Sequence, residues 1–123
     1  MADPQLASEA TTAVDFDGAH LDHITMQDQS LALEVLGLFL GQLPLTLARL
    51  AAAGTAADWQ FTAHGLKGSA AAVGARRLSA LAAGLEEAGF PESPQRREKE
   101  LQSLQAAAAG FRLAVREAFP TLG

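Results

Sequence analysis

Apolar residues recur at alternating intervals of four and three along most of the chain, and this spacing allows one kind of regular structure. In residues 30–53 the series consists of Leu36, Leu40, Leu43, Leu47 and Leu50. An α-helix places such residues on one stripe, whereas a half-buried strand requires strict alternation of apolar and polar residues. No run of strand length alternates in this way, and alanine and leucine far outnumber β-branched residues. The sequence therefore predicts an all-α fold.

Helix-breaking residues divide this pattern into one short and four long segments. The breaks fall at residues 15–18, 54–55, 73–74 and 89–94, each of which contains a glycine. The three later long segments repeat the same spacing. Their expected core positions are Trp59, Ala63, Leu66, Ala70 and Val73; then Leu78, Leu81, Leu85 and Ala88; and finally Leu101, Leu104, Ala108, Phe111, Val115 and Ala118.

Short joints between long amphipathic helices favour one architecture. Such helices pack as an up-and-down antiparallel four-helix bundle, and the short segment near residues 19–25 is expected to cover one end. Ser93 and Pro94 fit the N-cap and the first position of the last helix. Residues 1–15 lack the pattern and are expected to form a flexible N-terminal leader, so the domain is expected to span residues 16–120.

The composition excludes several classes of function. Nine Lys and Arg against fourteen Asp and Glu give a net charge of -5 without a basic stripe, so nucleic acid is not an expected partner. The chain has no cysteine for a disulfide, a thiolate metal site or a nucleophile. The longest uncharged apolar stretch, residues 35–48, contains Pro44 and is shorter than the roughly 18 residues of a membrane helix. We expect a soluble, cytoplasmic protein with no membrane partner.

His64 is the residue that most suggests a chemical function. It lies roughly 140° around the helix from the centre of its segment's apolar stripe, so it faces solvent. Gly65 and Gly68 in the helix interior each cost roughly 1 kcal/mol relative to alanine. Such a patch, poor in side chains, suits the approach of another protein's acidic pocket. The outward neighbours of His64 are Ala57, Gln60, Phe61, Lys67, Gly68 and Ala71.

Two charged residues are expected beside His64. The turn at residues 74–75 makes a helical hairpin, and antiparallel pairing across it sets Glu86 level with His64. A glutamate there can accept a hydrogen bond from the imidazole Nδ1–H, which fixes the tautomer whose Nε2 is nucleophilic. Lys67, one turn after His64 on the same face, offers the cation that a transferring phosphoryl group requires.

The segment of residues 30–53 carries more apolar residues than one core contact requires. Leu31, Val35, Leu38 and Leu45 lie roughly opposite its main stripe. Either this helix is central and packs against neighbours on both sides, or its second face binds a partner.

Two other kinds of site are not supported by the spacing. His20 and His23 lie at i and i+3 of the short segment, but no third metal ligand stands beside them. The run of residues 65–69 reads Gly-Leu-Lys-Gly-Ser, whereas a phosphate-binding loop requires Gly-Lys-Ser after a strand. Neither a metal site nor a nucleotide site is therefore expected.

One run of residues resembles the signature of a known family. Residues 63–70 read Ala-His-Gly-Leu-Lys-Gly-Ser-Ala and are followed by Val-Gly-Ala at residues 73–75. This resembles the histidine-containing phosphotransfer (HPt) domain, which typically has Ala-His-x-Leu-Lys-Gly-Ser with Gly-Ala after it. Similar residues occur at positions 20–21, 36–39 and 85–86, so the resemblance covers about residues 15–118.

The resemblance implies a specific chemistry, in which His64 is the phosphorylated residue. By the same likeness, Lys67 would steady the phosphoryl group and Gly68 would let the partner's aspartate approach. The family often has glutamine where this chain has Glu86. A glutamate can still accept the Nδ1–H bond, but its charge would disfavour a phosphoryl group close to it. Ser69 matches the family pattern but points away from His64, so we expect it to have a local structural role.

The resemblance also implies the partners, namely the receiver domains of a hybrid histidine kinase and of a response regulator. The Mg²⁺ of the reaction belongs to the receiver, so no intrinsic cofactor or metal is implied, and the chain has no ATP-binding segment for a kinase step. The alternatives are a receiver-binding scaffold without phosphotransfer and a homodimeric bundle that uses the second leucine face. A protein that acts by phosphotransfer is expected to be a monomer. The expected docking residues are Ala57, Phe61, Gly65, Gly68, Ala71, Leu31, Val35 and Leu38.

Overall fold

The computed structural model describes residues 15–120, and no strand occurs within them, which confirms the all-α prediction. The first two helices each begin and end one residue earlier than the segments expected near residues 19–25 and at residues 30–53, which is within the usual uncertainty of helix ends. The helices are α2 (Gly18–Ile24), α3 (Gln29–Ala52), α4 (Ala56–Ala72), α5 (Arg76–Ala88) and α6 (Pro94–Ala118).

Polar side chains fix where four of these helices begin. Asp17, Asp28, Thr55 and Ser93 each accept a hydrogen bond, 3.0–3.1 Å long, from the backbone N–H three residues later. These N-caps satisfy amide groups that have no partner inside the first helical turn. Pro94 directly follows Ser93 as the first residue of α6, as the sequence predicts. Loop residues thus determine the helix boundaries.

The turn between α4 and α5 requires a glycine at Gly74. Its φ of +80° lies in the left-handed region that residues with side chains rarely adopt. A Cβ at this position would stand 2.5 Å from the carbonyl oxygen of Asp17. The backbone N–H of Asp17 donates a 2.7 Å hydrogen bond to the Gly74 carbonyl. The glycine therefore lets the segment before α2 pack directly against the turn of the α4–α5 hairpin.

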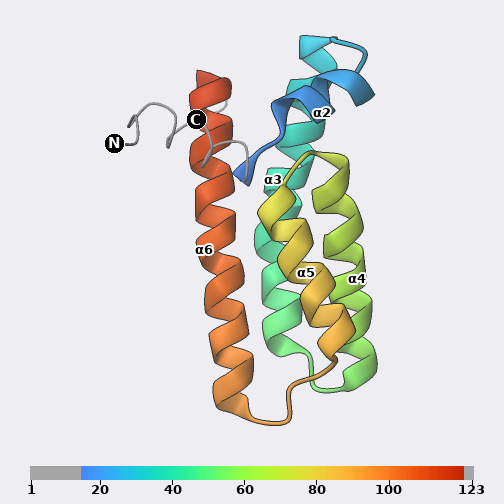
Figure 1. The fold of residues 1–123 in the computed structure, drawn as a ribbon, viewed down its shortest axis with the longest axis vertical. Helices are drawn as coiled ribbons and strands as arrows, with labels where there is room; N and C mark the ends of the chain where they lie inside the picture. Colours follow the sequence, from blue (N-terminus) through green and yellow to red (C-terminus); the bar gives the residue numbers. More distant parts are fainter. Residues whose placement is uncertain (1–14, 121–123) are drawn as a thin grey trace, which may run out of the picture.

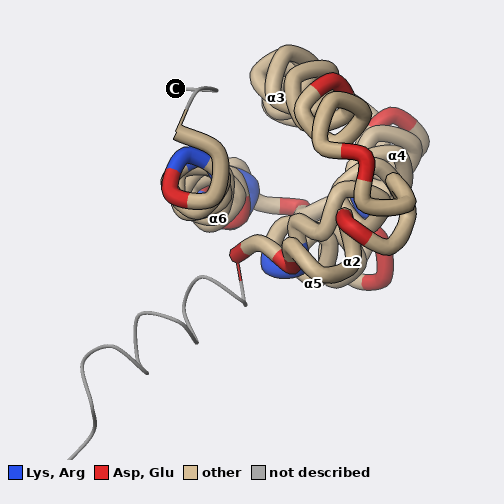
Figure 2. The backbone as a smooth tube through the Cα atoms, turned by 90° about the horizontal axis from the view of Figure 1, so that it is seen from above, with Lys and Arg blue, Asp and Glu red and all other residues tan. Residues whose placement is uncertain are grey.

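In the view of Figure 1, the chain runs down α3, up α4, down α5 and up α6. Contacts join α3 to α4, α4 to α5, α5 to α6, and α6 back to α3, and the α4–α5 contact is the most extensive. Seen from above, α4 and α6 stand on opposite sides of this group (Figure 2). The short helix α2 packs against α3.

The core contains most of the positions predicted from the spacing. All five predicted positions of residues 56–73 are buried, and Trp59 is completely buried. In α3, Leu40 is only partly buried, and Phe39 is buried in addition to the predicted residues. The fully buried large side chains stabilise the fold by roughly 1.5–3 kcal/mol each relative to solvent exposure.

Two predicted core positions are wrong. Ala88 and Ala118 are exposed, because each is the last residue of its helix and has less of the chain around it. Ala82, Ala107 and Ala114 are buried instead. An alanine contributes little to an apolar stripe read from sequence, yet its small size lets two helices approach closely.

Aromatic rings join α6 to the segment before α2. The Phe111 ring lies 5.7 Å from Phe16 and 5.4 Å from Phe39 between centroids, both in edge-to-face geometry. Asp15, which the sequence places in the leader, is buried, and its Oδ1 lies 3.6 Å from Arg77 Nη1. The rest of the expected leader, residues 1–14, lies outside the described residues.

By length and composition, α3 could cross a membrane, although the uncharged stretch within it is short. This feature is weak evidence for a membrane span, because the core helix of a helical bundle meets the same criterion. Six side chains of α3 are buried within the structure: Ala32, Leu36, Phe39, Leu43, Leu47 and Leu50.

Candidate functional site

His64 lies in the middle of α4 and points away from the core. Its neighbours Ala63 and Leu66 are buried, whereas the His64 side chain is 69% exposed. The outward direction predicted from the helical period is thus confirmed. A long helix holds the backbone at this position, so the imidazole is presented from a rigid element.

Glu86 on α5 contacts the imidazole from the side. Its Oε1 lies 3.0 Å from His64 Nδ1, the contact that antiparallel pairing across the hairpin predicts. Leu85, one residue earlier, is buried in the core and fixes the rotation of α5 at this level. A carboxylate can only accept a hydrogen bond, so the contact places a proton on Nδ1. In the neutral imidazole, Nε2 then carries the lone pair.

Lys67 also contacts Glu86, and the helical spacing does not predict this contact. Lys67 Nζ lies 2.9 Å from Glu86 Oε2, while the other carboxylate oxygen faces His64. Oε2 is enclosed, and its contact with Lys67 is an ion pair that lacks the angles of a hydrogen bond. Glu86 therefore bridges the imidazole and the ammonium group. The signal that points to this pair in the sequence is the presence of opposite charges on facing sides of the hairpin.

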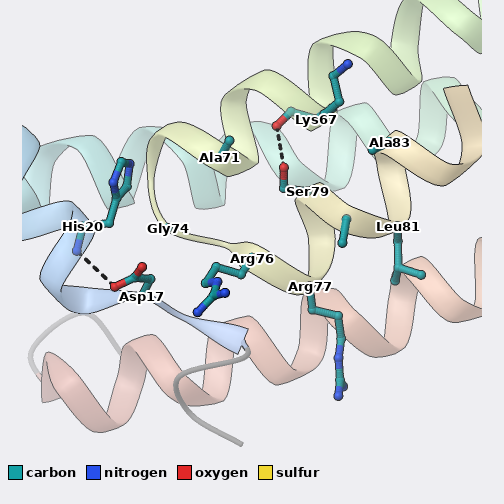
Figure 3. A pocket seen from close by; sticks show the side chains of 11 residues that line it. Asp17, His20, Lys67, Ala71, Gly74, Arg76, Arg77, Ser79, Leu81 and Ala83 are labelled. Atoms are coloured by element: carbon teal, nitrogen blue, oxygen red, sulfur yellow. Dashed lines mark hydrogen bonds between the residues drawn. The ribbon is translucent and has the colours of Figure 1, made fainter. Parts of the chain in front are cut away.

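The backbone beneath Lys67 is tied to α5. Ser79 Oγ donates a 3.1 Å hydrogen bond to the Lys67 carbonyl oxygen (Figure 3). The Lys67 side chain extends away from Ser79 in the same view, and it is 37% exposed. The hydrogen bond thus ties the Lys67 backbone to α5 without engaging its ammonium group.

The two basic groups change the acidity of Glu86. Two neighbours lower the pKa of the Glu86 carboxyl below its ordinary value. The Lys67 ammonium has the larger effect, and the hydrogen bond from His64 has the next largest. Both contacts favour the ionised form, because each supplies a donor or a positive charge to the carboxylate. Glu86 is therefore a carboxylate at neutral pH.

The surface beside His64 is poor in side chains, as expected. Methyl groups at Gly65 or Gly68 would meet no other part of the chain within 4 Å, so no internal contact requires these glycines. Phe61, one turn before His64, is 81% exposed. Ala57 and Ala71 are exposed on the same helix. The structure thus brings together the α4 residues that the sequence assigns to docking.

The apolar face of α3 continues this surface, with one exception. Leu38 is 66% exposed and Leu45 is 56% exposed, and Leu31 is also exposed. Val35, assigned to the same face, is partly buried and packs against the core. A groove of about 270 Å³ lies between α3 and α4, where Leu38 and Gln42 face Ser69 and Ala72.

A second hollow, of about 740 Å³, begins on the other side of Lys67 and follows the seam between α4 and α5 (Figure 3). Ala71 and Ser79 line its middle, Ala83 lies near its Lys67 end, and His20 and Arg76 stand near its far end. The sequence does not predict this hollow, because its small lining residues belong to two different helices.

The remaining candidate residues have plainer environments. Among residues 15–120, no group of three His, Asp or Glu side chains is placed to hold a metal ion, and His20 and His23 have no third ligand. Ser69 Oγ donates to the carbonyl oxygens of Gly65 and Leu66 in its own helix, in agreement with a local structural role.

Comparison with known proteins identifies the family of the chain. Residues 34–118, more than half of the chain, match the model of the family described as the Hpt domain, and the match includes His64, Lys67 and Glu86. Neither the curated proteins nor the solved structures gave a match. The chain therefore belongs to the Hpt domain family, the histidine-containing phosphotransfer domains that act with receiver domains in phosphorelays.

Proposed function

We propose that this protein is a phosphorelay intermediate that accepts a phosphoryl group on His64 from one receiver domain and passes it to another. The observation that carries the proposal is the exposed imidazole whose Nδ1 is held 3.0 Å from Glu86. This contact leaves Nε2 as the free nucleophile on a surface that another protein can reach.

The transfer step uses only groups of the two proteins. The Nε2 lone pair of His64 forms a bond to phosphorus while the bond from phosphorus to the donor's aspartate oxygen breaks, and the aspartate leaves as a carboxylate. Nδ1 keeps its proton, so the ring gains a positive charge. The carboxylate of Glu86, beside that proton, stabilises the charge. The reverse step on the second receiver restores the neutral imidazole.

Lys67 supplies a positive charge on the same face as His64. A phosphoryl group in transfer carries negative charge on its equatorial oxygens, and a nearby cation lowers the energy of that arrangement. The negative charge of Glu86 would oppose the incoming group if it were alone. Its ion pair with Lys67 supports the proposal, because the pair offsets that charge before the partner arrives.

The surface around His64 fits a partner with a recessed aspartate. Gly65 and Gly68 leave room for the rim of the partner's pocket, and Phe61 and Leu38 offer apolar contacts at the edge. Both receivers must reach the same Nε2, so this one surface serves donor and acceptor in turn. Ala57, Ala71 and Leu31 extend it along α4 and α3, whereas Val35 contributes little because it packs against the core.

Several finer features belong to the same proposal. The helices form an up-and-down antiparallel four-helix bundle with α2 as a short additional helix. The protein acts as a cytoplasmic monomer, and its partners are receiver domains of a hybrid histidine kinase and a response regulator, not nucleic acid or a membrane. The Mg²⁺ that the transfer requires enters with the receiver, and the chain itself contributes no cofactor.

Phosphotransfer to His64→Gln tests this function. The protein is incubated with a panel of receiver domains that carry radiolabelled phosphoaspartate. We expect an acid-labile, alkali-stable label on the wild type, and none on His64→Gln, because glutamine has no nucleophilic ring nitrogen. His23→Gln, which removes an exposed histidine from α2, is the matched control and should keep the label. Retention of the label in His64→Gln would overturn the proposal, and binding of receivers without any label would favour a scaffold.

A further inference from the structure

We infer that Glu86 binds Lys67 only while His64 is unphosphorylated, and that the Lys67 ammonium moves from Glu86 to the phosphoryl group once it is on Nε2. This inference rests on the proposed function, because it requires a phosphoryl group on His64. It makes Glu86 a positioning residue with two roles, one toward the imidazole and one toward the lysine.

The geometry of one carboxylate carries this inference. Its two oxygens have different partners, with His64 Nδ1 3.0 Å from Oε1 and Lys67 Nζ 2.9 Å from Oε2. The Lys67 ammonium is therefore already engaged in the unphosphorylated protein. While it is held 2.9 Å from Oε2, it gives less of its charge to a group on the other ring nitrogen.

The phosphoryl group is the stronger attractant for Lys67. A phosphoryl group carries a charge of about -1.5 to -2 and three acceptor oxygens, whereas the carboxylate carries a single charge. Lysine has a flexible four-carbon stem, and that of Lys67 is partly exposed beside the α4–α5 hollow. The Ser79 hydrogen bond holds the Lys67 backbone, so the side chain moves without a shift of the helix.

The exchange of partners affects the phosphorylation equilibrium. The ion pair between Glu86 and Lys67 stabilises the unphosphorylated protein and is lost on phosphorylation, so it opposes the gain of a phosphoryl group. After the exchange, Glu86 still accepts the Nδ1–H bond from a ring that now carries a positive charge. A glutamine at position 86 could accept the same bond but would leave the ammonium group unbound from the start.

A double-mutant cycle tests the exchange. The wild type, Glu86→Gln, Lys67→Met and the double variant are each equilibrated with phosphoramidate and ammonia, and phospho-His64 is measured by ³¹P NMR. In this reaction the phosphorus–nitrogen bond of phosphoramidate breaks, the bond to Nε2 forms, and ammonia leaves. Glu86→Gln should shift the equilibrium toward phospho-His64 in the presence of Lys67. We expect this shift to be about two- to fivefold larger than the shift that the same substitution causes in the Lys67→Met background.

Controls separate this inference from the proposed function. Glu87→Gln removes the same charge from an exposed neighbouring position and should show no such dependence on Lys67. Circular dichroism establishes that each variant is folded. Equal shifts in the two backgrounds would overturn the exchange while phosphorylation of His64 remained intact. A ³¹P signal that persists in His64→Gln would instead contradict the proposed function itself.

A second measurement detects the movement directly. The ¹³C chemical shift of the Glu86 carboxyl is followed at neutral pH with and without the phosphoryl group, because phosphohistidine is acid-labile and would not survive a titration of the carboxyl. If the Lys67 ammonium leaves the carboxylate, this shift should change more on phosphorylation in the wild type than in Lys67→Met. An equal change in both proteins would show that Lys67 stays on Glu86.

Discussion

Glu86 stands beside the reactive histidine at a position where an uncharged side chain could make the same hydrogen bond. The negative charge of Glu86 is offset at this position, because the Lys67 ammonium lies 2.9 Å from the second carboxylate oxygen. The three side chains form one chain of contacts in which Glu86 is the shared member. A substitution at Glu86 therefore changes two interactions, and only a cycle with Lys67 separates them.

The lowered pKa of Glu86 predicts a pH-dependent contribution to stability. Lys67 first, and then His64, stabilise the carboxylate in the folded chain, so its folded pKa lies below its unfolded value. Such a group stabilises the fold at pH values above the unfolded pKa, and this contribution disappears as the pH falls through the folded pKa. We expect Glu86→Gln to unfold at a lower urea concentration than the wild type at neutral pH, and the difference to vanish in acid.

Urea titrations at a series of pH values check this prediction. Glu87→Gln is the control, because Glu87 is an exposed carboxyl group next to Glu86 in the sequence. Its unfolding midpoint should stay close to that of the wild type at every pH. A destabilisation of Glu86→Gln that increases on acidification would have the wrong sign for a carboxyl with a lowered pKa.

At the scale of the element, α4 has two surfaces with different requirements. Its buried side, with Trp59 and Leu66, is packed against the core. Its outward side includes Gly65 and Gly68, where a helix would be more stable with alanine. The glycines are not needed for packing within the chain, and their cost is explained if a partner approaches closely at this surface.

Gly68→Ala is expected to stabilise the protein and to impair phosphotransfer. The added methyl group meets no other part of the chain within 4 Å and raises helix propensity, for a gain of up to about 1 kcal/mol. The same methyl group stands one turn from His64, where it would obstruct a receiver's aspartate. Urea unfolding measures the first effect, and the rate of transfer from a receiver measures the second.

Gly74→Ala provides the opposite case for the same experiment. Gly74 has a φ of +80°, and a Cβ there would collide with the Asp17 carbonyl. We therefore expect the Gly74→Ala variant to be less stable than the wild type by more than about 1 kcal/mol. Destabilisation of Gly68→Ala of similar size would contradict our explanation of the glycines on α4.

At the scale of the whole molecule, the contacts between helices place α4, which carries His64, away from α6. α4 contacts α3 and α5, whereas α6 contacts α3 and α5 from the other side, as Figure 2 shows. Exposed apolar residues therefore occur on two separate sides of the molecule. Phe61 and Leu38 lie on α4 and α3 with His64, and Leu113 lies on α6.

Charge substitutions at two leucines test which surface docks a receiver. Leu38 is 66% exposed and Leu113 is 58% exposed, so neither Leu38→Glu nor Leu113→Glu should greatly change the stability. We expect Leu38→Glu to weaken binding of a receiver by roughly tenfold, because a charge would be buried at the interface, and Leu113→Glu to leave it unchanged. Isothermal titration calorimetry measures both, and equal effects would argue against docking on the α3–α4 side.

The sequence by itself determined the features that depend on one helix or on one hairpin. The four-three spacing gave the helices and most of their buried residues, and the same period placed His64 on the outside. Antiparallel pairing about Gly74 set Glu86 beside it, because a tight turn leaves little freedom of register. Hydrophobic periodicity and turn chemistry act over a few residues, so they can be read directly from the chain.

Only the tertiary structure decided which flexible or small side chains meet between elements. The Lys67 ammonium contacts Glu86, Val35 turns toward the core, and Phe16 packs on Phe111 from outside the predicted helices. Periodicity gives the direction of a residue from its own helix axis, but a contact also depends on the distance and rotation of the neighbouring helix. For this reason the presence of His64, Lys67 and Glu86 at one site was predictable, whereas the ion pair that links two of them was not.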